Sequence, residues 1–284
     1  MTRGLADSHV HLHAYDDDAI AAMLARAAAA GVERVVGVAV DLPSARRTIE
    51  IAAAHPDRVV VAVGLHPAHL GDPSDGAAWR ALEELAADPR VRAIGECGVD
   101  AIDGDAAGPV QLAVLARHAR LAKGLGKGLL LHLRGAALVG PALGVLAAVG
   151  LPEGRAVVHY FVGDRELADR YLDAGLLLSL GKPVTRAENA ALREAVRNAP
   201  LDRLLLETDT YPVPGRTTEP ADTRLVAEAV ADLRRTTLEE VARVTGANLE
   251  RLLGTAPPFA SIAGRPGRRP PPARGRGRMG RPAG

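Results

Sequence analysis

Short, nearly continuous apolar runs alternate along the chain with longer stretches rich in Ala, Arg and Glu. Apolar runs without a polar alternation are typical of strands that are buried on both faces of a parallel sheet. Eight such runs are predicted strands, and they cover residues 4–11, 34–40, 59–65, 93–98, 128–133, 156–161, 176–180 and 204–207. The pattern therefore predicts an α/β protein built from repeated strand–helix units.

The stretches between these runs have the composition of helices. Clear examples cover residues 17–30, 44–54, 77–87 and 110–124; after a turn-rich loop at 212–220, further helices are predicted at 221–234 and 238–245, and a closing element at 248–253. Thr237 and Glu240 form the pattern of a capping box at the start of one of them. Because a helix follows each strand and no glycine-rich nucleotide-binding turn follows the first, the sequence favours a closed (β/α)8 TIM-type barrel over an open sheet.

The end of the chain differs from the rest. Pro, Gly and Arg dominate residues 257–284, and seven arginines but no acid fall within 264–284, although the formal net charge of the whole chain is only +1. Such a segment buries too little apolar surface to offset the entropy lost on ordering. The sequence therefore predicts one barrel domain over residues 1–256 and a disordered tail over 257–284.

The composition also bears on the core and the compartment. Hydrophobic residues make up 48% of the chain but aromatic residues only 2%, so Ala, Val and Leu must fill the core, and one cysteine allows no intrachain disulfide. The first residues lack the apolar segment of a signal peptide, and the most apolar run, 129–151, contains His132, Arg134 and Pro141. We expect a cytoplasmic protein with no membrane partner, and nothing indicates an obligate protein partner.

A pair of histidines ends the first predicted strand. His9 and His11 are two positions apart, so their side chains project to the same side of the strand. Neutral imidazoles are good ligands for divalent transition metals. The pair alone is equally consistent with two hydrogen-bonded histidines, and His13, which continues the alternation, falls where the loop begins and is left out.

Other polar residues end predicted strands that are otherwise apolar: Glu96, His132, His159 and Asp209. Burying any one of them without a partner costs several kcal/mol, and each alone could be a satisfied core residue. Because the carboxyl ends of barrel strands meet at one mouth, we expect them to converge with the histidine pair as ligands of two divalent ions. Glu96 would bridge the ions, and Asp209 would be a ligand and general base for a bound water.

The order of these motifs resembles the TatD-type metal-dependent deoxyribonucleases, which belong to the amidohydrolase-like barrels. The matching segments are Asp7-Ser-His-Val-His-Leu12, Gly64-Leu-His-Pro67, Gly95-Glu-Cys-Gly-Val-Asp100, Leu131-His-Leu-Arg134, Val158-His-Tyr-Phe-Val-Gly163, Leu206-Glu-Thr-Asp209 and Thr245-x-x-Asn248-x-x-Arg251-Leu252. The resemblance covers residues 3–254. It implies a (β/α)8 barrel, two divalent metal ions (Mg, Mn or Zn), and hydrolysis of DNA phosphodiester bonds, often from the 3′ end. The family's metal ligands fall on His9, His11, Glu96, His132, His159 and Asp209.

Three further residues are candidates for substrate binding. His66 and Arg134 match family positions that line the site. The planar guanidinium of Arg134 suits a phosphate, although it could instead pair with a barrel acid, and His66, which precedes Pro67, could only cap its loop. Tyr211 lies in a predicted loop near the mouth and could stack on a base, worth about 1–3 kcal/mol.

The chain also departs from the family pattern. Where the family usually shows Gln-x3-Phe-x2-Gln, this sequence has Gln111, Leu115 and His118; Thr210-Tyr211-Pro212 replaces the usual Pro and aromatic residue after the last acid, and Arg216-Thr-Thr-Glu219-Pro220 replaces Arg…Asn-Glu-Pro. None of these changes removes a metal ligand. They alter the rim, where the substrate would bind.

Two other functions stay open at this point. The same barrel could hydrolyse a C–N or ester bond of a small molecule, but such enzymes often bridge their metals with a carbamylated lysine on the fourth strand, where this chain has Glu96. The arginine-rich tail could make the chain a nucleic-acid-binding module whose affinity falls as salt rises. DNA or another nucleotide phosphodiester is the expected partner.

Overall fold

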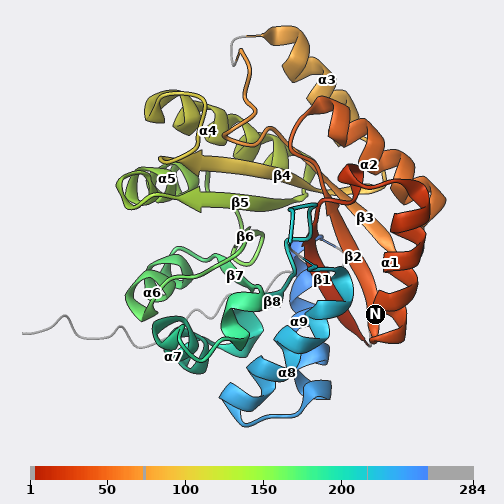
Figure 1. Cartoon of the computed structure of the whole chain (residues 1–284). Helices are drawn as coiled ribbons and strands as arrows, with labels where there is room; N and C mark the ends of the chain where they lie inside the picture. The colour runs from red at the N-terminus through yellow and green to blue at the C-terminus, as the bar shows by residue number, and fades with distance from the viewer. Residues whose placement is uncertain (1–3, 73–74, 216, 255–284) are drawn as a thin grey trace, which may run out of the picture.

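The strands form one closed parallel sheet. The computed structural model describes residues 4–72, 75–215 and 217–254. Each strand pairs in parallel with the next along the chain, in the order β1 to β8 (Figure 1). The strands are β1 (Leu5–Val10), β2 (Val32–Val38), β3 (Val59–Val63), β4 (Val91–Asp100), β5 (Gly128–Arg134), β6 (Ala156–Val158), β7 (Leu177–Leu180) and β8 (Leu204–Leu206).

Helices follow the strands and surround the sheet (Figure 1). The helices are α1 (Asp17–Ala29), α2 (Leu42–Ala54), α3 (Gly76–Ala86), α4 (Gly108–Leu125), α5 (Ala136–Val149), α6 (Arg165–Asp173), α7 (Ala190–Asn198), α8 (Thr223–Arg234) and α9 (Leu238–Leu252), with 3-10 turns η1 (Leu12–Ala14), η2 (Lys182–Thr185), η3 (Leu201–Arg203) and η4 (Pro220–Asp222). Within the described ranges, none of these helices is both long enough and apolar enough to cross a membrane.

The barrel closes between its last and first strands, beyond the end of β8. Val10 bridges Thr210 in parallel. The backbone N–H of His11 donates to the carbonyl of Thr210 at 2.9 Å, and the N–H of Asp209 donates to the carbonyl of His9 at 3.0 Å. The prediction of a (β/α)8 barrel is therefore confirmed, and its closing hydrogen bonds join two segments that carry candidate ligands.

Small apolar side chains fill the barrel, and α9 covers its amino-terminal end. Leu249 and Leu252 of α9, with Leu253 after it, belong to the same buried cluster as the inward-facing residues of the strands: Ala6, Val36, Val38, Ala62, Ala93, Leu130, Val157, Leu177 and Leu205. An ion pair joins Arg34 on β2 to Glu250 on α9. With this end closed, the mouth at the carboxyl ends of the strands remains for chemistry.

Several boundaries differ from the prediction. β6 ends at Val158, so His159 lies just beyond its strand, which was predicted to reach residue 161. β8 ends at Leu206, one residue earlier than predicted, and Asp209 follows it. α9 is one helix to Leu252, where the sequence predicted a break. Thr237 accepts a hydrogen bond from the backbone N–H of Glu240 at 3.1 Å, as a capping residue should. Residues 257–284, with the seven arginines, lie outside the described residues, so the tail and the domain boundary stay predictions.

Candidate metal centre

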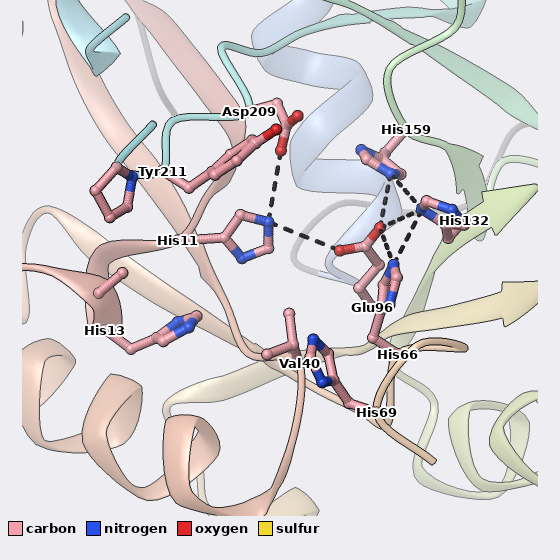
Figure 2. A pocket seen from close by; sticks show the side chains of 12 residues that line it. His11, His13, Val40, His66, His69, Glu96, His132, His159, Asp209 and Tyr211 are labelled. Carbon is pink, nitrogen blue, oxygen red and sulfur yellow. Dashed lines mark hydrogen bonds and ion pairs between the residues drawn. The ribbon is translucent and has the colours of Figure 1, made fainter. Parts of the chain in front are cut away.

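A pocket of about 440 Å³ opens at the mouth of the barrel, and side chains from most of the strand ends reach it (Figure 2). The lining residues are His11, His13, Ala14, Val40, His66, His69, Glu96, His132, His159, Asp209, Tyr211 and Pro212. Five of the six predicted metal ligands are among them. The sixth, His9, is fully buried beside the pocket on β1.

Glu96 lies at the centre of the group, and its two carboxylate oxygens face different histidines. Its Oε1 is 2.8 Å from Nδ1 of His132 and 2.7 Å from Nε2 of His159. Its Oε2 is 3.3 Å from Nε2 of His9 and 3.8 Å from Nε2 of His11. A carboxylate placed in this way can bridge two cations, because each oxygen belongs to a separate set of nitrogen atoms.

Asp209 completes the set around Oε2 of Glu96. Its Oδ1 lies 3.5 Å from Nε2 of His11 and 4.0 Å from Nε2 of His9, whose Nε2 atoms are themselves 3.2 Å apart. His9, His11 and Asp209 form one group of candidate ligand atoms within 4.8 Å of one another. The alternation along β1 therefore brings the histidine pair to one point, as its spacing predicted.

The donor atoms of these residues fit divalent cations. Pairs of imidazole nitrogens face each other at 3.2 Å in three places: His9 with His11, His132 with His159, and His66 with His132. Each contact needs a shared proton or a cation between the two nitrogens. Since carboxylates face the same points, the group has the nitrogen and oxygen ligands of a transition-metal site.

The charges of the site follow from burial and neighbours. Burial by itself would raise the pKa of Glu96, but the imidazoles of His159, His9 and His132 hold that pKa well below its usual value. Burial likewise opposes ionisation of Asp209, but the hydrogen bond from His11 and the nearby histidines lower its pKa. Both acids are therefore carboxylates at neutral pH, which is the form that binds a cation.

The histidines divide into two kinds. Burial, followed by the charge of His159, lowers the pKa of His9, so its imidazole is neutral. For His159 burial acts in the same direction, but the carboxylates of Glu96 and Glu207 outweigh it and raise the pKa well above its usual value. A cation between Glu96 and His159 would replace the proton that His159 holds.

The three predicted substrate-binding residues lie in different surroundings. Nε2 of His66 is 3.6 Å from Oε1 of Glu96, while its Nδ1 accepts a hydrogen bond from the backbone N–H of Ala68 at 3.1 Å, so this residue both caps its loop and lines the pocket. Tyr211 is 39% exposed at the mouth, with its ring edge-on to His11 at 6.0 Å. It is therefore available to a ligand in the pocket.

Arg134 does not line the pocket among the described residues. Its guanidinium forms an ion pair with Asp103 and lies 3.5 Å from Oδ2 of Asp100. Pairing with a barrel acid was the alternative that the sequence left open. In the structure the side chain is about half-exposed, so it can turn toward the solvent near the mouth.

Several polar residues around the site were not selected from the sequence. Oδ2 of Asp100 lies 3.0 Å from Nε2 of His132 and orients its ring. Asp7 is fully buried, and its Oδ2 accepts hydrogen bonds from the hydroxyls of Thr208 at 2.5 Å and Thr223 at 3.1 Å, tying β1 to the segment after β8; burial raises the pKa of Asp7 to about 7. Both acids lie inside the motifs quoted above, and that position was the available signal.

Glu207, His13 and His69 are also part of this region. His13, set aside because a loop was expected, lies in η1 and lines the pocket with His69. Glu207 is fully buried behind His159, 3.6 Å from its Nδ1. No rule of strand spacing distinguishes Glu207 from Asp209 once β8 has ended, so only the folded chain shows which acid enters the pocket.

Comparisons with known proteins find a family model, similar sequences and similar structures that agree on one family. The family model described as TatD related DNase matches residues 6–254. The chain is 41% identical over 263 residues to an uncharacterized metal-dependent hydrolase, TatD, of Mycobacterium tuberculosis, covering 88% of this chain and 98% of the relative. It is 31% identical over 251 residues to a protein of Edwardsiella piscicida named 3′-5′ ssDNA/RNA exonuclease TatD, covering 82% and 93%. Among solved structures, the TatD homologue YJJV of Escherichia coli K12 has a TM-score of 0.77 and 28% identity, covering 88% and 98%.

Proposed function

Because the chain belongs to the TatD related DNase family of metal-dependent hydrolases, we propose that it removes nucleotides from the 3′ end of single-stranded DNA by hydrolysing phosphodiester bonds. The observation that carries the proposal is the position of Glu96, whose two oxygens face separate groups of candidate metal ligands. Relatives named as 3′-5′ ssDNA/RNA exonucleases support the choice of substrate and of polarity.

The proposed ligand sets share Glu96. His9, His11 and Asp209 would hold one ion, and His132 and His159 would hold the other. Two divalent ions bound there would lower the pKa of a bound water and offset the charge of the phosphate oxygens. A set rich in imidazole favours zinc or manganese over magnesium, which prefers oxygen ligands.

His66 is better suited to the substrate than to a metal ion. Its Nδ1 accepts a hydrogen bond from the N–H of Ala68, so the hydrogen of the neutral ring resides on Nε2. Burial, outweighing the attraction of Glu96, lowers the pKa of His66 to about 4, so the ring is neutral at physiological pH. Nε2 then has an N–H to donate to a phosphate oxygen and no lone pair for an ion.

Asp209 and Tyr211 have different proposed tasks on the same segment. The ionised carboxylate of Asp209 lies at the pocket wall above His11, where it can accept the proton of the attacking water (Figure 2). Tyr211 would stack on the base next to the cleaved bond. The pocket ends on the packed interior of the barrel, which favours entry of a strand end over passage of a continuous strand.

The test combines metal analysis with end-labelled substrates. Purified protein would be analysed for bound metal and then incubated with single-stranded DNA labelled at the 5′ or the 3′ end, with Mg, Mn or Zn added. We expect a ladder of shortened products from the 5′-labelled strand and early release of label from the 3′-labelled strand, both abolished by chelator and by Asp209→Asn.

Other outcomes would decide against the proposal. Bound metal without cleavage of DNA or RNA, together with turnover of an amide or lactone panel, would replace it with hydrolysis of a C–N or ester bond. Protein that binds no metal under any condition would rule out metal-dependent hydrolysis at this site. Release of label from the 5′ end first would reverse the proposed polarity.

A further inference from the structure

Three buried polar atoms beneath the candidate metal centre have no hydrogen-bond partner in the part of the chain that the structure describes: Nδ1 of His9, Nδ1 of His159 and Oε2 of Glu207. The three residues also form one group in which a candidate ligand atom of each lies within 4.8 Å of those of the others. Buried polar atoms without partners are rare and costly. Three of them in one place indicate that the three side chains act as one hydrogen-bonding group.

The orientation of the His9 and His159 rings shows which nitrogen of each faces Glu207. The imidazoles of His9 and His159 are stacked, with centroids 4.2 Å apart and planes at 21°. Nε2 of each ring faces Glu96, at 3.3 Å for His9 and 2.7 Å for His159. Their Nδ1 atoms therefore face away from the pocket, toward the barrel interior that contains Glu207.

Glu207 is held rigidly on that side. It is fully buried, and its Oε1 accepts a hydrogen bond from the backbone N–H of Tyr160 at 2.5 Å. The same oxygen is 3.6 Å from Nδ1 of His159, slightly beyond hydrogen-bond distance. A carboxylate offers acceptors on both oxygens and no donor of its own. It is therefore the one acidic side chain of this segment that two Nδ1–H groups can share.

We propose that Glu207 is a positioning residue that keeps a hydrogen on Nδ1 of both His9 and His159, and so leaves Nε2 of each ring to bind metal. An imidazole nitrogen binds metal only with a free lone pair, and the partner of the other nitrogen decides which one has it. His9 belongs to one proposed ion and His159 to the other. One buried carboxylate thus orients a ligand of each ion, and the inference rests on the proposed metal-dependent function.

The test uses a substitution that keeps shape and changes hydrogen bonding. Glu207→Gln replaces one acceptor oxygen with an NH2 donor, so one of the two rings must turn its lone pair on Nδ1 toward the amide and place its hydrogen on Nε2. Leu205→Val is the matched control, because Leu205 is buried in the barrel interior two residues earlier and is not one of the proposed ligands.

Two measurements report on the proposal independently of turnover. Long-range 1H–15N spectra of metal-free, 15N-labelled protein should show hydrogen on Nδ1 of both His9 and His159, whether or not Nε2 is also protonated. Titration with Zn2+ against a competing chelator should then show about 10–100-fold weaker binding for Glu207→Gln, the usual effect of losing such a partner. We expect Leu205→Val to melt at a lower temperature but to keep the wild-type spectra and affinity.

Distinct results would overturn the two proposals. A wild-type spectrum in which Nδ1 of either ring lacks hydrogen overturns the role of Glu207, and this holds even if Glu207→Gln fails to fold. Unchanged Zn2+ affinity in Glu207→Gln, or an equal loss in Leu205→Val, overturns it as well. Wild-type protein that shows the expected spectra but binds no divalent ion overturns the proposed metal-dependent function instead.

Discussion

A buried histidine outside the candidate metal centre gives a quantitative prediction about stability. His118 on α4 is fully buried; its Nδ1 donates to the carbonyl of Val114 at 2.9 Å, and its Nε2 accepts from the backbone N–H of Leu65 at 3.1 Å. The ring also packs edge-on against Trp79, with centroids 4.9 Å apart. The bond from Leu65 requires the neutral ring, since a proton on Nε2 would face the N–H of Leu65. Burial lowers the pKa of His118 from 6.5 to about 4.

The lowered pKa of His118 makes the free energy of unfolding depend on pH. In the unfolded chain the histidine takes up a proton near pH 6.5, whereas in the folded protein it resists protonation until about pH 4. Its stabilising contribution is therefore complete above pH 6.5 and is lost as the pH falls toward 4. At about 1.4 kcal/mol per pH unit, the loss reaches about 2 kcal/mol by pH 5 and about 3 kcal/mol at pH 4.

Replacing His118 with Gln isolates this contribution. The family pattern has glutamine at this position, and its amide can accept from Leu65 and donate to Val114 without titrating. We would measure the free energy of unfolding by urea denaturation at pH 7.5, 6.5, 5.5 and 5.0. Every other titrating group is common to both proteins, so the difference in slope belongs to His118. We expect wild type to lose about 2 kcal/mol more than His118→Gln between pH 7.5 and 5; parallel curves would refute the reasoning.

Substitutions at four other positions test the candidate site and the backbone that supports it. Asp209→Asn should melt near the wild-type temperature and lose about 10²–10⁴-fold in turnover, so wild-type activity would contradict its role as base. Tyr211→Ala should raise KM for single-stranded DNA by about 5–150-fold, while Tyr211→Phe keeps the stacking and stays near wild type. The ion pair of Arg134 is partly exposed, so Arg134→Ala should change the free energy of unfolding by less than about 1 kcal/mol. The slope of log affinity for DNA against log salt concentration should fall by about the amount that one phosphate contact contributes. Gly98→Ala should fold poorly and bind less metal, because its Cβ would lie 2.0 Å from the carbonyl oxygen of His132 and its φ is +148°; a stable variant with normal metal content would contradict this.

The fold could be predicted because parallel strands buried on both faces leave an unmistakable apolar pattern, but the ends of elements depend on tertiary contacts. In α9, Gly246 and Asn248 suggest the end of a helix, yet the helix continues to Leu252. The side-chain amide of Asn248 donates to the carbonyls of Leu201 at 3.0 Å and Leu204 at 2.8 Å. Asn248 is a poor helix former, but its amide satisfies two carbonyl groups at the bottom of the barrel. Helix propensity depends on local sequence and cannot predict these tertiary hydrogen bonds.

The candidate ligands were accessible from the sequence for a related reason: a histidine or acid after an apolar run must have a partner, and barrel strand ends share one mouth. The sequence does not show which way a side chain points once its strand has ended. Arg134 matches a family position that lines the site, but its guanidinium pairs with Asp103, the kind of pairing that the sequence left open. Glu207 and Asp209 are both acids two residues apart, yet one lies beneath the histidines and the other enters the pocket.

The backbone explains how these two acids come to lie on different sides of the site. Among the described residues, the non-glycine positions with positive φ are Tyr160 at 47°, Asp209 at 51° and Arg235 at 53°, and Arg235 is simply the C-cap of α8. The other two lie shortly after β6 and β8 and make contacts within the site: the N–H of Tyr160 donates to Glu207, and the N–H of Asp209 donates to the carbonyl of His9. Such conformations cost about 1–3 kcal/mol each and persist only where packing enforces them. Glycine would relieve the cost at position 209 but would remove the carboxylate that we propose as a ligand. Position 209 therefore combines a strained backbone with a proposed ligand, and the packing of the barrel holds the strained conformation in place.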